Sequence, residues 1–231
     1  ENPFRSSRDY EGYTNRDIFG TTIQAERTGA SMRLSSTTGF LKWKTEDSTD
    51  LDYSPMPLIT RDNAEEDFQF TQEVRLASAA PRKLSDAAAL RWQTGAFLFT
   101  RSYQQDAVNT YAPYLLSQFI EFPVNEYSPV SELEDFGLGL FGQGTVTFKE
   151  KLDLVAGVRL DYENKNADLR TFFDPAIAPP TVVVAEDSFS QFSPQLAAAY
   201  RFTPEYSVYG TVSNGFKSGG FNTGFGRLPI A

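Results

Sequence analysis

The sequence of 231 residues contains no cysteine and no histidine, and it has only 2 methionines. Without cysteine the chain has no disulfide, no thiol nucleophile and no cysteine-ligated zinc or iron–sulfur site. Without histidine it lacks the commonest general base, the Ser–His catalytic pair and the histidine ligands of metal sites. The sequence therefore predicts a protein that is not an enzyme, with no catalytic residues, no cofactor and no metal ligands.

Long apolar runs and an excess of basic charge are also missing. No run approaches the ~18 apolar residues of a membrane-spanning helix. Lysine and arginine together number 21, against 30 aspartates and glutamates, and the net charge is −9. Because an acidic chain repels a phosphate backbone, we expect no nucleic-acid partner. The length fits one all-β domain or at most two small domains.

Aromatic residues and alternating patterns are abundant. The chain contains 20 phenylalanines, 11 tyrosines and 2 tryptophans. Apolar and polar residues alternate with a period of two, most clearly on either side of residues 149–151, and this period is typical of β-strands with two different faces. The pattern predicts eight strands in four hairpins, over residues 18–26, 32–43, 68–76, 90–103, 135–149, 152–164, 192–202 and 206–216.

The connections between these predicted strands alternate in length. A transmembrane β-barrel has this asymmetry, with short turns on its periplasmic side and long loops outside the cell. A tilted membrane-spanning strand needs ~9–11 residues, which the predicted strands provide. Short connections are expected at 27–29, 149–151 and 203–205, and long ones at 46–67, 104–134 and 171–187.

The placement of aromatic residues distinguishes a barrel from a soluble β-sandwich, whose strands alternate in the same way. Phe148 and Tyr200 lie beside short turns, while Phe136, Tyr162 and Phe189 lie at the far ends of the strands. Two aromatic belts that flank an apolar band are typical of membrane interfaces. The predicted fold class is therefore an all-β, antiparallel, up-and-down transmembrane β-barrel.

One glycine motif matches a nucleotide-binding pattern but lacks its context. Gly137, Gly139 and Gly142 have the spacing G-x-G-x-x-G, which binds a pyrophosphate only where a strand ends and a helix begins. Here the strand alternation continues through residues 143–148. The glycines are therefore interpreted as points of close approach within a strand.

The candidate ligand-binding residues lie in the predicted loop 104–134. Its aromatic side chains either contact a ligand from outside the cell or pack the loop over the barrel mouth. A second candidate is the acidic stretch 62–67, whose oxygens suit calcium but which lacks a calcium-binding loop pattern and is more simply a solvated charge run. The aromatic candidates are Tyr111, Tyr114, Phe119, Phe122 and Tyr127.

Three segments together resemble one protein family. They are Phe70-Thr-Gln-Glu-Val-Arg-Leu-Ala-Ser78, Ala156-Gly-Val-Arg-Leu-Asp-Tyr162 and Ser213-Asn-Gly-Phe-Lys-Ser-Gly-Gly-Phe-Asn222. The first and third are specific, and in this order they resemble barrel segments of the TonB-dependent outer-membrane receptors. The resemblance covers about residues 68–225, and the first fifty residues share only the rhythm of strands and loops.

The resemblance implies a fold, a location and a set of partners. Such receptors have a 22-stranded barrel filled by an N-terminal plug, and the plug is preceded by a segment that contacts TonB. Residues 1–231 would then be an internal part of the barrel, about eight strands, with no plug. The implied function is TonB-energised uptake of a scarce ligand, such as an iron–siderophore, across the outer membrane of a Gram-negative bacterium. The implied partners are outer-membrane lipid, the small ligand, and TonB only through a plug absent from this chain.

Two other functions fit the alternation. One is a passive outer-membrane pore or adhesin barrel, and the other is a soluble β-sandwich that binds carbohydrate. An open eight-stranded piece of a barrel also has two unpaired edges, at 18–26 and 206–216, and unpaired edges are not tolerated in lipid.

Overall fold

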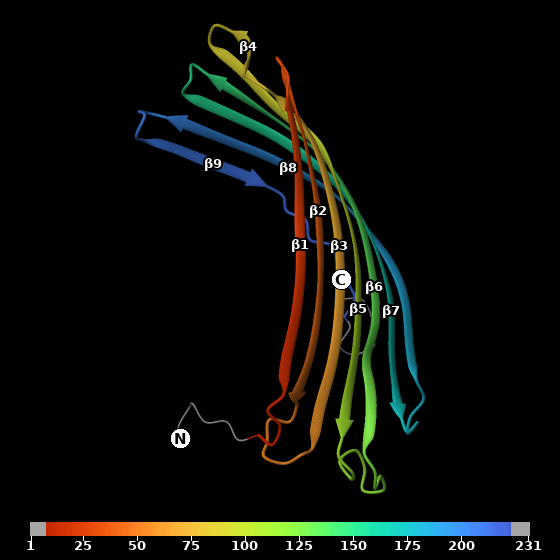
Figure 1. Ribbon diagram of the computed structural model, residues 1–231. Coiled ribbons are helices and arrows are strands. Elements are labelled where there is room, and N and C mark those ends of the chain that lie inside the picture. The colour runs from red at the N-terminus through yellow and green to blue at the C-terminus, as the bar shows by residue number, and fades with distance from the viewer. Residues whose placement is uncertain (1–7, 223–231) are drawn as a thin grey trace.

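The protein, seen in a computed structural model that describes residues 8–222, is a single antiparallel sheet of nine strands (Figure 1). Each long strand pairs with the next long strand along the chain, so the topology is an up-and-down meander. No helix long and apolar enough to cross a membrane occurs within residues 8–222. The strands are β1 Tyr13–Thr28, β2 Met32–Asp50, β3 Ile59–Ser78, β4 Arg82–Ser85, β5 Ala88–Tyr111, β6 Val124–Phe148, β7 Leu152–Asp174, β8 Thr181–Arg201 and β9 Ser207–Ser213.

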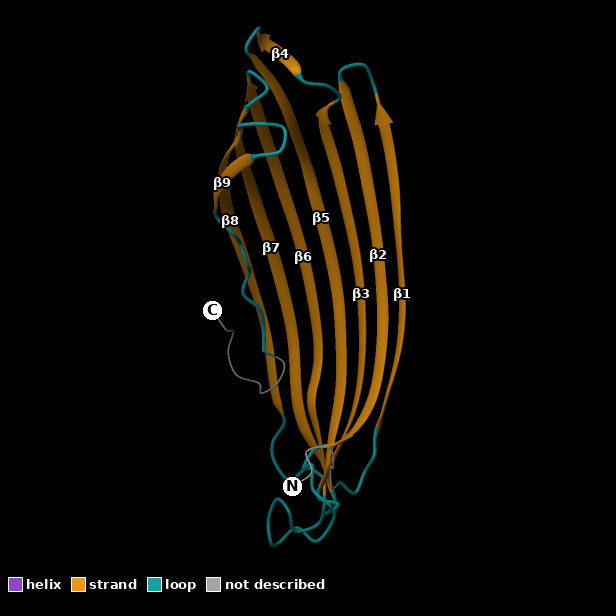
Figure 2. Cartoon of the chain, turned by 90° about the vertical axis from the view of Figure 1, so that its left-hand side faces the viewer, coloured by secondary structure: helices purple, strands orange, loops and turns teal. Residues whose placement is uncertain are grey.

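The sheet is one curved layer, and its concave side is open (Figures 1 and 2). Within the described residues β1 pairs only with β2, and β9 pairs only with β8. The two unpaired edges predicted from the sequence are therefore present. A sandwich requires two facing sheets. The described chain has one sheet, so the sandwich interpretation does not fit, whereas a section of a barrel wall does.

Short turns and long loops lie at opposite ends of the sheet, as the sequence predicted. Residues 29–31, 149–151 and 202–206 form turns at the end that carries β4, the upper end in Figure 1. The loops at the other end are 51–58, 112–123 and 175–180.

The strands are longer than predicted, and the loops are correspondingly shorter. β6 alone has 25 residues, which at a rise of about 3.4 Å per residue gives a strand of about 80 Å. A membrane span needs only ~9–11 residues. The strands therefore continue well beyond the height of a bilayer at the long-loop end, through most of what was predicted as loop.

Two further strand predictions were wrong in detail. β4, Arg82–Ser85, is an additional short strand that pairs with the start of β5. Its polar, short sequence gave no alternation by which to recognise it. The last strand, predicted over 206–216, ends at Ser213 in β9.

The two faces of the sheet differ in chemistry. Residues directly opposite each other in neighbouring strands share a face, and Leu140, Leu160 and Phe192 form one such row across β6, β7 and β8. All three are exposed, and they belong to the convex face. Phe189, predicted in an aromatic belt, is opposite Glu163 instead and therefore lies on the concave face.

A row of charged residues divides the sheet into two halves. Arg101, Asp135 and Lys165 lie directly opposite one another on β5, β6 and β7. We call the part between this row and the short turns the short-turn half, and the part between the row and the long loops the long-loop half. The convex face is a band of large apolar side chains in the short-turn half and is mostly polar in the long-loop half.

Candidate functional site

The concave face of the long-loop half carries aromatic rings beside arginines. The rings of Trp43 and Tyr103 are 6.1 Å apart. Arg16 lies over Trp43 at 5.9 Å from the ring centroid, and Arg101 lies over Tyr103 at 5.2 Å. Both rings sit opposite Asp67 in the strand register. Rings and guanidinium groups in this arrangement attract each other. Together they present a flat apolar and cationic surface on the concave side of the sheet.

A hydrogen-bonded row lies next to these rings, closer to the loops. Asn63 Nδ2 donates to Asp47 Oδ1 at 3.1 Å, and Gln105 Nε2 donates to Asn63 Oδ1 at 2.8 Å. Gln105 Nε2 also lies 3.2 Å from Glu65 Oε1. Because these groups satisfy one another across β2, β3 and β5, the row is a rigid polar surface rather than a set of free side chains.

A second row contains Tyr111, one of the predicted ligand-binding residues. Its hydroxyl donates to Glu126 Oε2 at 2.6 Å, and Asn109 Nδ2 donates to the same oxygen at 3.2 Å. Arg61 in turn donates to Asn109 at 3.3 Å. Burial, followed by the hydrogen bond to Glu126, raises the pKa of Tyr111 to about 12. The phenol is therefore a neutral, oriented group at pH 7.

The five predicted aromatic residues do not form one cluster. Tyr114, Phe119 and Phe122 lie in loop 112–123, where Phe119 is 82% exposed and Tyr114 is 57% exposed. Tyr111 ends β5 on the concave face. Tyr127 lies within β6, and its ring stacks on Phe172 of β7 at 4.6 Å. The prediction that all five lie in a loop was therefore wrong for Tyr111 and Tyr127.

The loop itself is closed by its own backbone. The Tyr114 amide donates to the Ile120 carbonyl at 2.7 Å, and the Ile120 amide donates to the Ser117 carbonyl at 3.0 Å. Leu115 and Leu116 are exposed beside the aromatic residues. The loop thus holds an apolar tip out in solvent at the long-loop end, as an exposed recognition surface would require.

The acidic stretch 62–67 lies within β3, and its side chains alternate between the two faces. Asp62 accepts a hydrogen bond from Ser48 on one face, and Asp67 binds Arg101 on the other. Glu66 pairs with both Lys42 and Lys44. No group of three or more histidine, cysteine, aspartate or glutamate residues that would suit a metal ion occurs within residues 8–222.

The glycine motif lies within a strand, as predicted. Gly137 and Gly139 lie within β6 on the concave face. A Cβ atom at Gly137 would lie 2.1 Å from Phe99 Cε1, and one at Gly139 would lie 2.6 Å from Arg159 Nη2. The missing side chains allow the neighbouring Phe99 and Arg159 to lie flat across β6.

Several residues of the concave face were not singled out from the sequence. Trp43 and Tyr103 were the last residues of two predicted strands, and nothing in either strand indicates that they meet. Their meeting depends on the register of β2 and β5 against β3, which sets both opposite Asp67. Sequence alternation fixes which face a residue takes, but not which residue it faces.

An apolar hollow of 820 Å³ lies mainly on the convex face of the short-turn half. Small residues, among them Gly144, Ala156, Ala198 and Gly210, form its floor between larger side chains. It lies in the apolar band and far along the sheet from the polar rows of the long-loop half.

The family model described as "TonB dependent receptor-like, beta-barrel" matches residues 1–228. The chain belongs to the TonB-dependent receptor β-barrel family. The resemblance inferred from three segments is confirmed. The match also includes the first fifty residues, for which the sequence motifs gave no support. This is a family of receptors and transporters, not of enzymes.

A solved structure has the same fold. It is the crystal structure of the ferric yersiniabactin uptake receptor FyuA from Yersinia pestis, with a TM-score of 0.70 and 14% sequence identity. The superposition covers 92% of this chain and 30% of FyuA. The chain therefore spans less than a third of that receptor, and its curved sheet corresponds to part of a TonB-dependent receptor barrel.

Proposed function

We propose that residues 1–231 are part of the barrel domain of an outer-membrane receptor for TonB-energised uptake of a scarce ligand such as an iron–siderophore. The observation that carries the proposal is the family match along almost the whole chain. In this proposal the apolar band of the short-turn half contacts outer-membrane lipid, and the short turns face the periplasm. In this proposal TonB acts through the plug of the receptor.

The ligand would meet the long-loop half first. The exposed rings of Tyr114, Phe119 and Phe122 supply apolar contact at the loop tip. The arginine-backed rings of Trp43 and Tyr103 line the concave wall behind it. This combination of flat aromatic surface and guanidinium groups suits an anionic chelate that carries flat groups. Of the five aromatic residues of the sequence prediction, Tyr114, Phe119 and Phe122 would then act at the loop tip and Tyr111 on the concave wall, whereas Tyr127 lies on the convex face.

Uptake of radioactive iron tests the function in the intact receptor. Cells that carry the receptor gene, cells that lack it, and cells that lack tonB are starved of iron and offered a panel of ferric siderophores. We expect uptake of at least one chelate that requires both genes. Uptake that requires the receptor but not tonB would favour the passive pore instead. An adhesin would show no receptor-dependent uptake.

Substitutions at the loop tip test the proposed ligand contacts. Phe119→Ala and Tyr114→Ala should weaken binding of the transported chelate to whole cells about 5- to 20-fold, because each removes an exposed ring. Leu84→Ala is the matched control, since Leu84 is an exposed apolar residue of β4 at the opposite end of the sheet. Equal affinities for all three variants and the natural receptor would contradict the assignment.

A further inference from the structure

The apolar hollow on the convex face has no role in the proposed uptake. Its volume is 820 Å³, and it lies within the apolar band of the short-turn half. Further from the short turns, the row of Leu140, Leu160 and Phe192 has a large side chain on each of three strands. In the hollow, each of two successive rows combines two small residues with two large ones. These rows are Gly144–Ala156–Leu196–Val212 and Val146–Leu154–Ala198–Gly210.

The hollow lies at the depth of a single membrane leaflet. Phe148, Tyr200 and Phe202 form an aromatic edge beside the short turns, and the rings of Tyr200 and Phe202 are 4.9 Å apart. Such rings are typical of a membrane interface. Gly144 lies four residues from Phe148 along β6, which is about 14 Å along the strand. For a strand tilted by about 45° this is about 10 Å below the interface, within the hydrocarbon of one leaflet of about 15 Å.

Basic side chains without acidic partners lie next to the hollow. Lys149 and Lys151 belong to the turn between β6 and β7, and both are exposed. Arg82 is opposite Leu90, which lines the hollow, so Arg82 shares its convex face. Within residues 8–222 none of these three basic side chains makes an ion pair or a side-chain hydrogen bond. Only Glu150 lies between the two lysines, so an excess of positive charge remains beside the hollow.

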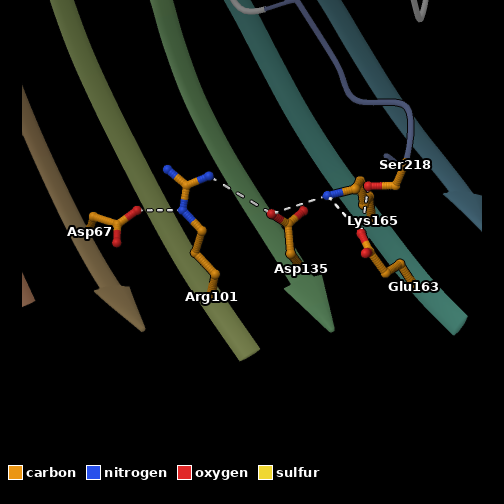
Figure 3. A network of polar contacts seen from close by, with 6 residues as sticks. All are labelled: Asp67, Arg101, Asp135, Glu163, Lys165 and Ser218. Atoms are coloured by element: carbon orange, nitrogen blue, oxygen red, sulfur yellow. Dashed lines mark hydrogen bonds and ion pairs between the residues drawn. The ribbon is translucent and has the colours of Figure 1, made fainter. Parts of the chain in front are cut away.

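Other basic side chains of the wall are neutralised by carboxylates. In the charged row of the concave face, Arg101 lies 2.5 Å from Asp67 and 3.9 Å from Asp135 (Figure 3). Lys165 lies 3.5 Å from Asp135 and 3.4 Å from Glu163. We call these five residues the concave network. Paired basic residues of the short-turn end are Lys83 with Asp86 and Arg201 with Asp153. The basic side chains beside the hollow have no such carboxylate and remain available to an anion from outside the chain.

We propose that the hollow and its basic rim bind one anionic glycerophospholipid. This inference rests on the proposed function, which places the short turns toward the periplasm and the hollow in the periplasmic leaflet. An acyl chain fills the hollow, and the phosphate lies at Lys149, Lys151 and Arg82. Basic groups at a membrane surface bind anionic headgroups, and each apolar group that the chain buries adds to the affinity. The site therefore selects a lipid by its headgroup, unlike the rest of the apolar band.

Native mass spectrometry of the intact receptor in a mild detergent measures this selectivity. The receptor is titrated with phosphatidylglycerol, or with phosphatidylethanolamine that carries the same acyl chains. We expect one phosphatidylglycerol to bind at least about 5-fold more tightly than phosphatidylethanolamine, which carries no net charge, because each basic residue near a membrane surface contributes about that factor. Equal affinities for the two lipids would overturn the proposal.

Substitution of the two lysines tests the position of the headgroup. Lys149→Gln combined with Lys151→Gln should remove most of the preference for phosphatidylglycerol and leave the affinity for phosphatidylethanolamine unchanged. Arg27→Gln combined with Arg33→Gln is the matched control, because it removes the same charge beside the turn 29–31 at the same end of the sheet. An equal loss of preference in the control would assign the selectivity to the net charge of the receptor and refute the site.

Filling the hollow tests the position of the acyl chain. A Cβ atom at Gly210 would meet no atom within 4 Å, so the strand should accept Gly210→Leu. This variant should bind both lipids about 10-fold or more weakly, because the chain loses buried methylene groups. Gly142→Leu is the matched control, since this glycine of the same convex face lies outside the lining of the hollow.

A second filling variant, Ala198→Leu, keeps the test decisive if Gly210→Leu does not assemble. Undiminished binding of phosphatidylglycerol by a filled receptor would overturn the proposal, and so would a receptor dimer that occupies the hollow in place of lipid. Radioactive-iron uptake separates this site from the proposed function. TonB-dependent uptake without selective lipid binding would refute only the lipid site, and selective lipid binding without such uptake would refute only the proposed function.

Discussion

The two halves of the sheet are built from the same strands but are stabilised differently. In the short-turn half the convex face presents large apolar side chains, and the concave face fits Phe99 and Phe141 against glycines. In the long-loop half polar residues such as Gln105, Asn109 and Ser131 are buried, and side-chain hydrogen bonds cross from strand to strand. In the proposed receptor, one half would have lipid outside and close packing inside, and the other would have water on both sides.

This difference shows that a barrel wall changes its stabilising interactions along its height. Where lipid covers one face, apolar contact with the bilayer stabilises the strand, and the ladder needs no side-chain network outside. Where water covers both faces, the backbone ladder competes with solvent. Cross-strand side-chain pairs then add to its stability. The boundary lies near the row of Arg101, Asp135 and Lys165.

The largest expected effect comes from placing a charge on the convex face. Val158→Arg should destabilise the folded receptor in lipid vesicles by about 2–4 kcal/mol, the cost of an arginine near the bilayer midplane. Val184→Arg, on the convex face of the long-loop half and opposite Asp168, should change stability by less than about 0.5 kcal/mol. Urea titrations of both variants in vesicles measure the difference. Equal losses of stability in the two variants would mean that the convex face has the same environment in both halves.

A smaller effect is expected from filling the concave face of the short-turn half. Gly137→Ala should cost about 1–3 kcal/mol, because its Cβ would lie 2.1 Å from Phe99. Gly142→Ala is the matched control on the same strand, where the nearest atom is 3.8 Å away on the convex face. Adding Phe99→Ala to Gly137→Ala should recover part of the loss if the clash is its cause. Urea titration of the three variants tests this.

The buried ion pair should contribute less than the packing. Asp67→Ala should destabilise the receptor by about 1–2 kcal/mol, below the usual cost of breaking a buried pair, because Arg101 is one-third exposed and keeps Asp135 nearby. Asp168→Ala, which breaks an exposed pair with Arg170, should have little effect. If Asp168→Ala proved the more costly of the two, the concave network would not be what stabilises the long-loop half.

The smallest expected effect is a pH dependence of loop 51–58. The Ser54 hydrogen bond and the Ile59 amide, 2.8 Å from Asp52 Oδ2, lower the pKa of Asp52 below its usual value near 4. A lowered folded-state pKa means that the carboxylate stabilises the loop above the unfolded-state pKa, and that this stabilisation is lost as pH falls through the folded-state value. Limited proteolysis at decreasing pH should cleave the loop faster below about pH 4. Asp52→Asn should be cleaved at a rate independent of pH.

The same contrast explains what the sequence predicted. Alternation identified all eight long strands and their order, because lipid on one face requires an apolar residue at every second position. Alternation missed the strand residues 104–111 and 124–134. With water on both faces, an apolar residue is not needed at every second position, so these residues were interpreted as loop. Tyr111 and Tyr127 were grouped for this reason, although they lie on opposite faces. The meeting of Trp43, Tyr103 and Asp67 depends on register, which alternation does not encode.

The length of the strands has a consequence for how the surface of the receptor can change. Strands of about 80 Å exceed what a bilayer of about 30 Å needs, even when they are tilted by about 45°. In the proposed receptor the surplus would carry loop 112–123 about 25 Å beyond the lipid. A substitution at the loop tip therefore alters nothing that touches the membrane. The residues of the tip can therefore change to suit a new ligand while the lipid-facing band stays the same.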